Sequence, residues 1–399
     1  MKYFSLFFLA IISTALTANS IFSFSGMPYR YYGCDVYSMG MGETGISDLF
    51  RINTDYYNPA NAVSTNQVTF ATGIGMGYIW YLDNASNSYR DDGLYFPYFV
   101  IAVPLGNHKI AFSVNTISSG ILENQGTNFW NGYAYEEINK ISANIYKADL
   151  IYAFKNRIMN IGLAANYYIG HRIRYWELDF VSSTLNDVKY ELDREFKNPG
   201  FSFGLNKKFG NLAIGMTYST ASELEEEIEF NYYHPPYTDI IEHDYTFMLP
   251  SQFSGGLTWR FLSKYKTSFD IYYEKWSETD TYEKDTFKYS WGIAYDPLSG
   301  YGEWYEQIPL RLGAYWRELP FTENGNDIYE KAVTAGISIP LKSPGKQIDL
   351  SGKYMVRGNL TDNGMRDRSI FFYVGISGFD IFSKRQRMIE HRDIPEAEN

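Results

Sequence analysis

The chain has 399 residues, is 18% aromatic and carries a formal net charge of −11 at pH 7. The negative charge argues against a nucleic-acid partner, because phosphate binding requires a basic surface. The one cysteine, Cys34, cannot form an internal disulfide, and the residues before it lack the leucine and small side chains of a lipid-attachment site.

The first 20 residues have the order of a secretory signal peptide. Lys2 gives a positive start, an apolar run follows at Phe4–Leu16, and small residues follow at Ala18-Asn19-Ser20. A helix needs about 20 apolar residues to cross a bilayer, so this run is too short for a membrane anchor. We predict export and cleavage after Ser20.

The rest of the chain contains no apolar run of 18 or more residues, which excludes a bundle of transmembrane helices. Its mean hydropathy of −0.32 suits a soluble protein, but 37 tyrosines and 28 phenylalanines are far above the usual content of a soluble protein. An outer-membrane β-barrel explains both values. Only one face of each strand must be apolar, and aromatic rings gather at the membrane–water interfaces. The lack of a linker or composition shift predicts one large barrel.

A glycine-rich stretch with acidic residues follows the predicted signal peptide and leads to Asn58-Pro59-Ala60. Pro59 fixes its own φ and biases the residues before it toward an extended or turn geometry. An Asn-Pro pair also marks an ordinary turn, so the motif alone has two interpretations.

Seven later segments alternate between large apolar residues and small or polar ones, which is the period of a strand with one apolar face. A soluble β-sandwich has the same alternation. The signal peptide, the length and the aromatic excess favour a barrel, in which the apolar face meets lipid and the other face lines the lumen. The segments are 212–218, 253–261, 268–274, 310–317, 333–339, 348–356 and 370–377.

The sequence predicts an all-β fold, a single antiparallel transmembrane barrel of 14 strands, because bacterial single-chain barrels have an even number. The predicted strands are 67–80, 94–104, 108–119, 140–155, 157–181, 186–208, 211–232, 244–262, 265–283, 285–296, 303–318, 328–341, 346–358 and 367–380. Short turns are predicted in the periplasm at Asn156, 209–211, 263–264 and 343–345. Longer connections are predicted outside the cell at 120–138, 181–188, 232–243, 280–302, 318–328 and 358–367.

Three predicted strands, 157–181, 186–208 and 211–232, exceed the roughly 10 residues that a tilted strand needs to cross the membrane. We therefore expect the wall to rise above the membrane. The acidic run Glu223–Glu229 lies on that part and is interpreted as a solvated face. A divalent cation or lipopolysaccharide contact is the alternative, because carboxylates bind hard cations.

No pattern of catalytic or metal-binding residues is present in the sequence. The five histidines show no metal-ligand spacing, so neither a metal nor a cofactor is predicted. Glu242-His243-Asp244 falls in or beside a predicted outer loop and is interpreted as solvated rather than catalytic. The chain also lacks a Gly-x-Ser-x-Gly elbow and a phosphate loop, so no enzyme is predicted.

Charged residues on the predicted lumen face are the better functional candidates. They either form interstrand ion pairs that hold the interior together or contact a ligand, and the sequence leaves both readings open. These residues are Arg260, Asp270, Glu274, Arg311, Arg317, Asp349 and Lys353.

Four short motifs carry a family resemblance. They are the glycine-rich stretch 38–63 with its Asn-Pro-Ala, Leu249-Pro250 followed by 255–259, the stretch 270–277, and 308–314. Together they resemble the long-chain fatty acid transporter (FadL-type) family of outer-membrane proteins.

The resemblance implies a 14-stranded barrel whose lumen is closed by its own N-terminal segment, a plug. By this analogy 1–20 is the signal peptide, 21–64 the plug, 65–380 the barrel and 381–399 a polar periplasmic tail. The polar tail is a departure, because many barrels end on a terminal aromatic. The implied plug motif consists of Gly40, Gly42, Gly45, Asn58, Pro59 and Ala60.

These features predict a multi-pass barrel of the bacterial outer membrane for passive uptake of hydrophobic or amphipathic small molecules, fatty-acid-like or aromatic. Its expected partners are outer-membrane lipid, lipopolysaccharide and the hydrophobic ligand. Two alternatives stay open. One is a structural or secretion-associated barrel that docks proteins, and the other is a general polar porin.

Overall fold

The computed structural model describes residues 20–23, 29–32, 34–86, 88–181, 185–234, 237–279, 284–297, 303–341 and 346–379. The predicted signal peptide, apart from Ser20, the predicted tail 381–399 and the predicted turn 343–345 lie outside the described residues. Within them, no helix has the length and apolar character required to span a bilayer.

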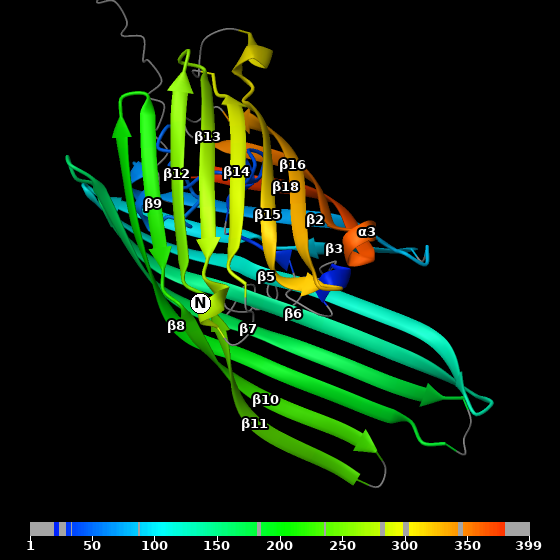
Figure 1. The fold of residues 1–399 in the computed structure, drawn as a ribbon. Helices are drawn as coiled ribbons and strands as arrows, with labels where there is room; N and C mark the ends of the chain where they lie inside the picture. The colour runs from blue at the N-terminus through cyan, green and yellow to red at the C-terminus, as the bar shows by residue number, and fades with distance from the viewer. Residues whose placement is uncertain are drawn as a thin grey trace, which may run out of the picture.

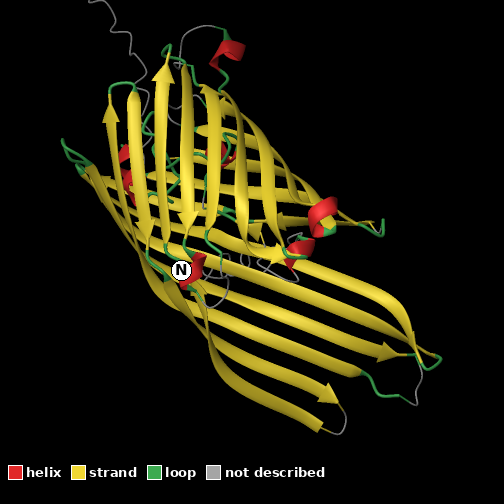
Figure 2. Ribbon diagram, in the orientation of Figure 1, coloured by secondary structure: helices red, strands yellow, loops and turns green. Residues whose placement is uncertain are grey.

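One antiparallel sheet forms a ring (Figures 1 and 2), which closes where β18 (Met365–Phe379) pairs with β2 (Thr69–Asp83). Three pairs of consecutive segments, β3–β4, β9–β10 and β11–β12, are single ribbons with a short interruption. The wall therefore has 14 strands, which confirms the predicted number. The other strands are β3 (Ser88–Tyr95), β4 (Tyr98–Leu105), β5 (His108–Trp130), β6 (Tyr133–Phe154), β7 (Asn160–Phe180), β8 (Val188–Phe209), β9 (Leu212–Ser219), β10 (Ser222–His234), β11 (Tyr237–Leu249), β12 (Gln252–Phe261), β13 (Tyr265–Glu274), β14 (Thr286–Tyr295), β15 (Leu310–Glu323), β16 (Asn326–Pro340) and β17 (Gln347–Asn359).

The two faces of the wall differ as the alternation predicts. Leu312 is 61% exposed beside Arg311 at 2%, and Phe372 is 53% exposed beside Phe371 at 2%. The outward residues form an apolar face suited to lipid, and the inward residues are small, polar or aromatic. A closed ring suits this setting because lipid offers no hydrogen-bond partner to an open sheet edge.

Three predicted outer loops are strands in the structure, so these predictions were wrong. Residues 120–138 belong to β5 and β6, 232–243 to β10 and β11, and 318–328 to β15 and β16. Tight Asn-Gly turns at 131–132 and 324–325, with positive φ at all four residues, join two of these hairpins. Strand residues that do not face lipid need no apolar face, so their polar sequences resemble those of loops.

Six strands, β5 to β8 with β10 and β11, continue past the rest of the ring as an extended sheet (Figure 1). β5 has 23 residues and β8 has 22, about twice the roughly 10 residues that a tilted strand needs to cross a membrane. The last of these strands, β11, has β10 as its ladder partner and no other among the described strands. The extended sheet therefore ends on an open backbone edge.

The N-terminal segment, meaning the described residues between 20 and 65, is packed inside the ring. Its elements are η1 (Ile21–Ser23), β1 (Tyr29–Arg30), α2 (Val36–Met39) and η2 (Pro59–Ser64). α2 packs against β16, β17 and β18, and η2 packs against β5 to β8. Short helices outside the segment are η3 (Trp276–Glu278), η4 (Trp304–Gln307) and α3 (Leu360–Asn363).

Candidate functional site

The N-terminal segment is organised around a buried aspartate–arginine pair. Asp35 accepts a hydrogen bond from the Ser38 N–H at 2.8 Å and so caps α2, while Arg51 Nη1 lies 2.6 Å from Asp35 Oδ2. Burial alone would raise the pKa of the Asp35 carboxyl, but the Arg51 guanidinium and hydrogen bonds to the carboxylate lower it. The loop from α2 to η2 is thus folded around a charged pair.

Glu43 connects the segment to two strands of the wall. Its Oε2 lies 2.6 Å from Lys288 Nζ on β14, and its Oε1 lies 3.0 Å from Lys353 Nζ on β17. Burial alone would raise the pKa of Glu43, but the two ammonium groups lower it to about 2. One carboxylate therefore neutralises two buried lysines at neutral pH.

Asp48 makes a second connection of the same kind. Its Oδ2 lies 2.7 Å from Lys266 Nζ on β13 and 3.1 Å from Arg51 Nε. Burial opposes ionisation here too, but Lys266 and then Arg51 lower the pKa of Asp48 to about 2. The segment is thereby tied to a third strand.

Asp270 on β13 holds the glycine turn of the segment. Its Oδ2 accepts hydrogen bonds from the backbone N–H groups of Gly45 at 2.7 Å and Ile46 at 3.1 Å. The predicted lumen residue Asp270 and the predicted motif residue Gly45 are therefore brought into direct contact.

Close backbone packing explains the two other glycines of the predicted motif. Gly42 has φ +71° and donates its N–H to Thr334 Oγ1 at 2.8 Å. A Cβ added to Gly313 of β15 would lie 2.2 Å from the Gly42 nitrogen, and one added to Gly40 would lie 2.9 Å from the Cα of Gly336. The backbones of segment and wall meet only because both sides lack side chains at these points.

Asn58-Pro59-Ala60 packs against the opposite side of the ring. The Asn58 side chain accepts from the Ala60 N–H at 3.0 Å, and its Nδ2 donates to the Ile46 carbonyl at 2.9 Å. A Cβ on Gly162 of β7 would lie 2.2 Å from the Ala60 nitrogen. Pro59 occupies the first position of η2, where its missing N–H costs nothing. The motif caps a helix that fits a glycine-lined groove.

The remaining predicted lumen charges fall into three separate groups. Glu274 pairs with Arg30 at 3.1 Å, while Arg317 binds Glu330 at 2.7 Å and also donates to the Arg30 carbonyl. Elsewhere, Arg260 donates to the Phe50 carbonyl at 3.3 Å and pairs with Asp296, and Arg311 shares Ser338 with Asp349. They do not converge on a single site.

Several residues that anchor the N-terminal segment were not identified from the sequence. Glu43 and Asp48 lie among other acidic residues, and nothing local marks their partners. Lys266 could have been identified, because it shares the inward face of β13 with Asp270 when the alternation of 268–274 is extended by two residues. The others are Lys288, Glu330, Arg357 and the wall glycines at 162, 204, 292 and 313.

The wall has a break between β3 and β5. β4 pairs with β5 up to Tyr98 opposite Asn115, whereas β3 pairs with β2 and has no other ladder partner among the described strands. Phe96-Pro97 separates β3 from β4, and Pro97 has no N–H for a ladder. β1 fills part of the break, with Tyr29 opposite Ser119 and Arg30 opposite Ser118.

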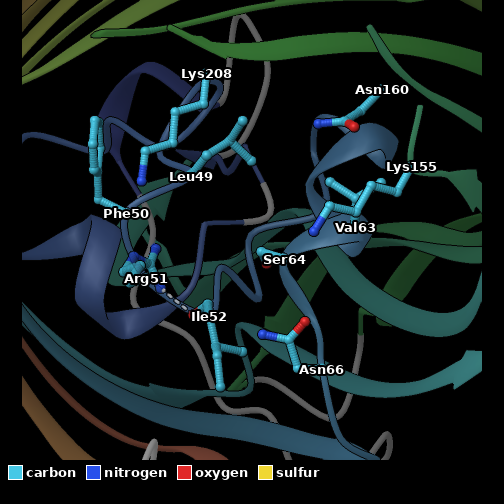
Figure 3. Close-up of a pocket in the computed structure, with 10 residues that line it drawn as sticks. All are labelled: Leu49, Phe50, Arg51, Ile52, Val63, Ser64, Asn66, Lys155, Asn160 and Lys208. Atoms are coloured by element: carbon cyan, nitrogen blue, oxygen red, sulfur yellow. Dashed lines mark hydrogen bonds between the residues drawn. The ribbon is translucent and has the colours of Figure 1, made fainter. Parts of the chain in front are cut away.

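A pocket of about 450 Å³ lies beside the short turns that follow β6 and β8, and Figure 3 shows the residues that line it. It lies between the N-terminal segment and the ends of β6, β7 and β8, and polar and apolar groups share its surface. Lys208 Nζ stands 4.2 Å from the centre of the Phe50 ring. The lining includes Leu49, Phe50, Val63, Lys155, Asn160 and Lys208.

We expect the segment to be held most firmly at about pH 4. Glu43 and Asp48, each with a pKa of about 2, contribute fully above pH 4.5 and lose this contribution as the pH falls toward 2. Burial, and then the nearby Asp35, raise the pKa of Asp55 to about 7, so its contribution is complete below pH 3.8 and lost as the pH rises through 7. Limited proteolysis of the segment in folded barrels, from roughly pH 3 to 9, measures both sides of this maximum.

Asp55→Asn provides the control for this pH profile. The neutral amide cannot ionise, so the loss of protection at alkaline pH should become smaller while the loss at acidic pH stays. An unchanged alkaline limb in Asp55→Asn would contradict the assignment.

The amino-acid sequence matches the model of one known protein family. A family model described as BamG matches residues 1–388. The comparison with curated sequences found no match.

Comparison with solved structures finds transport barrels. A FadL homologue of Pseudomonas aeruginosa has a TM-score of 0.64 and 13% identity, with 88% of this chain and 98% of that chain covered. The toluene transporter TbuX of Ralstonia pickettii has a TM-score of 0.63 and 14% identity, with 87% and 98% covered. The toluene transporter TodX of Pseudomonas putida has a TM-score of 0.62 and 14% identity, with 88% and 99% covered. At these identities the likeness establishes a shared fold.

Proposed function

This chain belongs to the BamG family, and we propose that it is an outer-membrane barrel that admits hydrophobic or amphipathic small molecules passively through the side of its wall. The break between β3 and β5 is the observation that carries this proposal. Support also comes from the fold shared with toluene transporters.

We propose further that the N-terminal segment acts as a fixed plug. Glu43 and Asp48 bind lysines on three different strands, and at Gly42 the backbone of the segment packs directly against the backbone of the wall. Axial passage would require breaking these buried ion pairs together, so a side route is the less costly path. The same contacts argue against an open polar porin.

Locking β1 into the break tests the side route. Tyr29 and Ser119 are opposite each other in an antiparallel pair, a Cα separation that a disulfide spans. In a Cys34→Ser background, Tyr29→Cys with Ser119→Cys should stop uptake of toluene or of a fluorescent fatty acid into proteoliposomes when oxidised. Reduction should restore uptake to the level of the Cys34→Ser control.

Two results would count against the proposal. Uptake that is equal in the oxidised and reduced variant would place the route elsewhere. A complete lack of uptake of both probes by the unmodified barrel would argue against transport itself.

Protein docking is a second candidate, and the extended sheet favours it. β11 presents an open backbone edge that can receive an extended segment of a partner protein as an added strand. The hairpin β10–β11 carries eight acidic residues and no lysine or arginine, so a basic segment is the expected occupant.

Excision of the β10–β11 hairpin separates docking from barrel folding. Ser219 at the end of β9 already pairs with Gln252 at the start of β12, so a short turn can replace 222–249 without opening the ring. A basic partner peptide should protect the β11 amides of the full chain from hydrogen exchange and should not bind the excised variant. Equal binding to both chains, or no protection of β11, would contradict the docking role.

A further inference from the structure

Asp367 of β18 forms an unusual buried carboxylate site at the start of the described chain. It is fully buried, its Oδ2 accepts a hydrogen bond from Ser20 Oγ, and the backbone N–H of Ile21 also donates to the carboxylate. Its Oδ1 has no hydrogen-bond partner among the described residues. A buried carboxylate oxygen without a donor is costly, so the site points to a missing hydrogen-bond donor.

The charges around Asp367 do not supply that donor. Arg357 acts on Asp367 through its charge, but its Nη2 lies 2.6 Å from Glu330 Oε2, the same oxygen that Arg317 binds. The described part of the chain contains no ion pair to Asp367 within 4.0 Å.

The predicted processing step creates a donor at this place. Hydrolysis of the Ser20–Ile21 peptide bond by water leaves a carboxylate on the released Ser20 and an ammonium group on Ile21. The Ile21 nitrogen, which already donates one hydrogen bond to Asp367, then carries a positive charge and three donors. Departure of Ser20 also removes the hydroxyl that occupies Oδ2.

Phe22 fixes the position of this nitrogen. Its side chain is fully buried in an apolar cluster with Trp276, Leu319 and Ile328, and it packs against the backbone at Gly358. Because Phe22 is the second residue after the cleavage point, its burial keeps the new chain end beside Asp367 and leaves that end little freedom to reach water.

We propose that Asp367 is the receptor for the α-ammonium group of Ile21 in the processed protein. The ion pair and the Phe22 anchor together fasten the mature N-terminus inside the ring. The unprocessed chain cannot form this pair, because its Ile21 nitrogen is an uncharged amide. Signal cleavage thereby completes the packing of the N-terminal segment, independently of whether the barrel transports a ligand.

Amine labelling of the mature full-length protein tests the proposal. The protein is purified from outer membranes, treated with an amine-reactive ester, and the N-terminal peptide is identified by mass spectrometry. We expect Ile21 as the first residue and labelling about tenfold or more slower than in the denatured protein, because a buried ion-paired amine is protected. Asp367→Asn should raise the labelling rate toward that of the denatured protein.

Asp362→Asn is the matched control, because Asp362 lies exposed in α3 near the start of the same strand. It should leave the labelling of Ile21 unchanged. If Asp367→Asn fails to fold, two other measurements test the proposal. Phe22→Ala, which removes the anchor of the chain end, should also raise the labelling rate of Ile21, and the wild-type protein should be labelled more slowly when folded than when denatured. A first residue other than Ile21, or an amine that reacts equally fast in the folded and denatured wild-type protein, would overturn the proposal.

Discussion

Glu43→Gln is expected to release the N-terminal segment while the barrel stays folded. The substitution leaves Lys288 and Lys353 buried without their carboxylate. Breaking a buried pair on one side costs about 3 kcal/mol or more, which corresponds to a rise of about a hundredfold in the released population. Planar-bilayer conductance and protease cleavage within 34–65 should both increase, while the barrel keeps its heat-modifiable mobility.

A rescue variant distinguishes the effect of the unpaired lysine charges from the effect of the altered side-chain shape at position 43. Adding Lys288→Met and Lys353→Met to Glu43→Gln removes the unpaired ammonium groups and should restore much of the low conductance. Glu123→Gln breaks the exposed pair with Lys140, whose side chains are 46% and 44% exposed, and should have no measurable effect. Equal conductance in Glu43→Gln and wild type would show that the ion pairs do not hold the segment.

The strand pattern was predictable because lipid imposes it. A strand that faces hydrocarbon must be apolar at every second residue, and segments such as 310–317 follow this rule without exception. Beyond the membrane the constraint disappears. The hairpin around Asn131-Gly132 therefore has no apolar face to reveal it, and its residues look like a loop.

The anchors of the N-terminal segment were not predictable in the same way. Glu43 and Lys353 are 310 positions apart, and neither belongs to a local motif that names the other. The glycines at 40, 42 and 45 could be recognised in the sequence as a glycine-rich stretch. A backbone that packs closely against another backbone requires residues without side chains. The wall glycines that face the segment, such as Gly313, have no such mark. In the sequence they are ordinary small residues of an alternating strand, and their role appears only when the position of the opposing backbone is known.

Gly313→Ala is expected to prevent the segment from seating, with an effect comparable to that of Glu43→Gln. An added Cβ would lie 2.2 Å from the Gly42 nitrogen and 2.4 Å from the Met41 carbonyl carbon, and backbone atoms on both sides cannot yield as a flexible side chain would. Gly352→Ala on β17 is the matched control, since its Cβ would meet no atom closer than 3.9 Å. We expect raised conductance and faster cleavage of 34–65 in Gly313→Ala alone. Because no charge is altered, such a result would establish that steric fit, as well as the ion pairs of Glu43 and Asp48, closes the ring. Wild-type conductance in Gly313→Ala would instead show that the segment can shift to admit a methyl group.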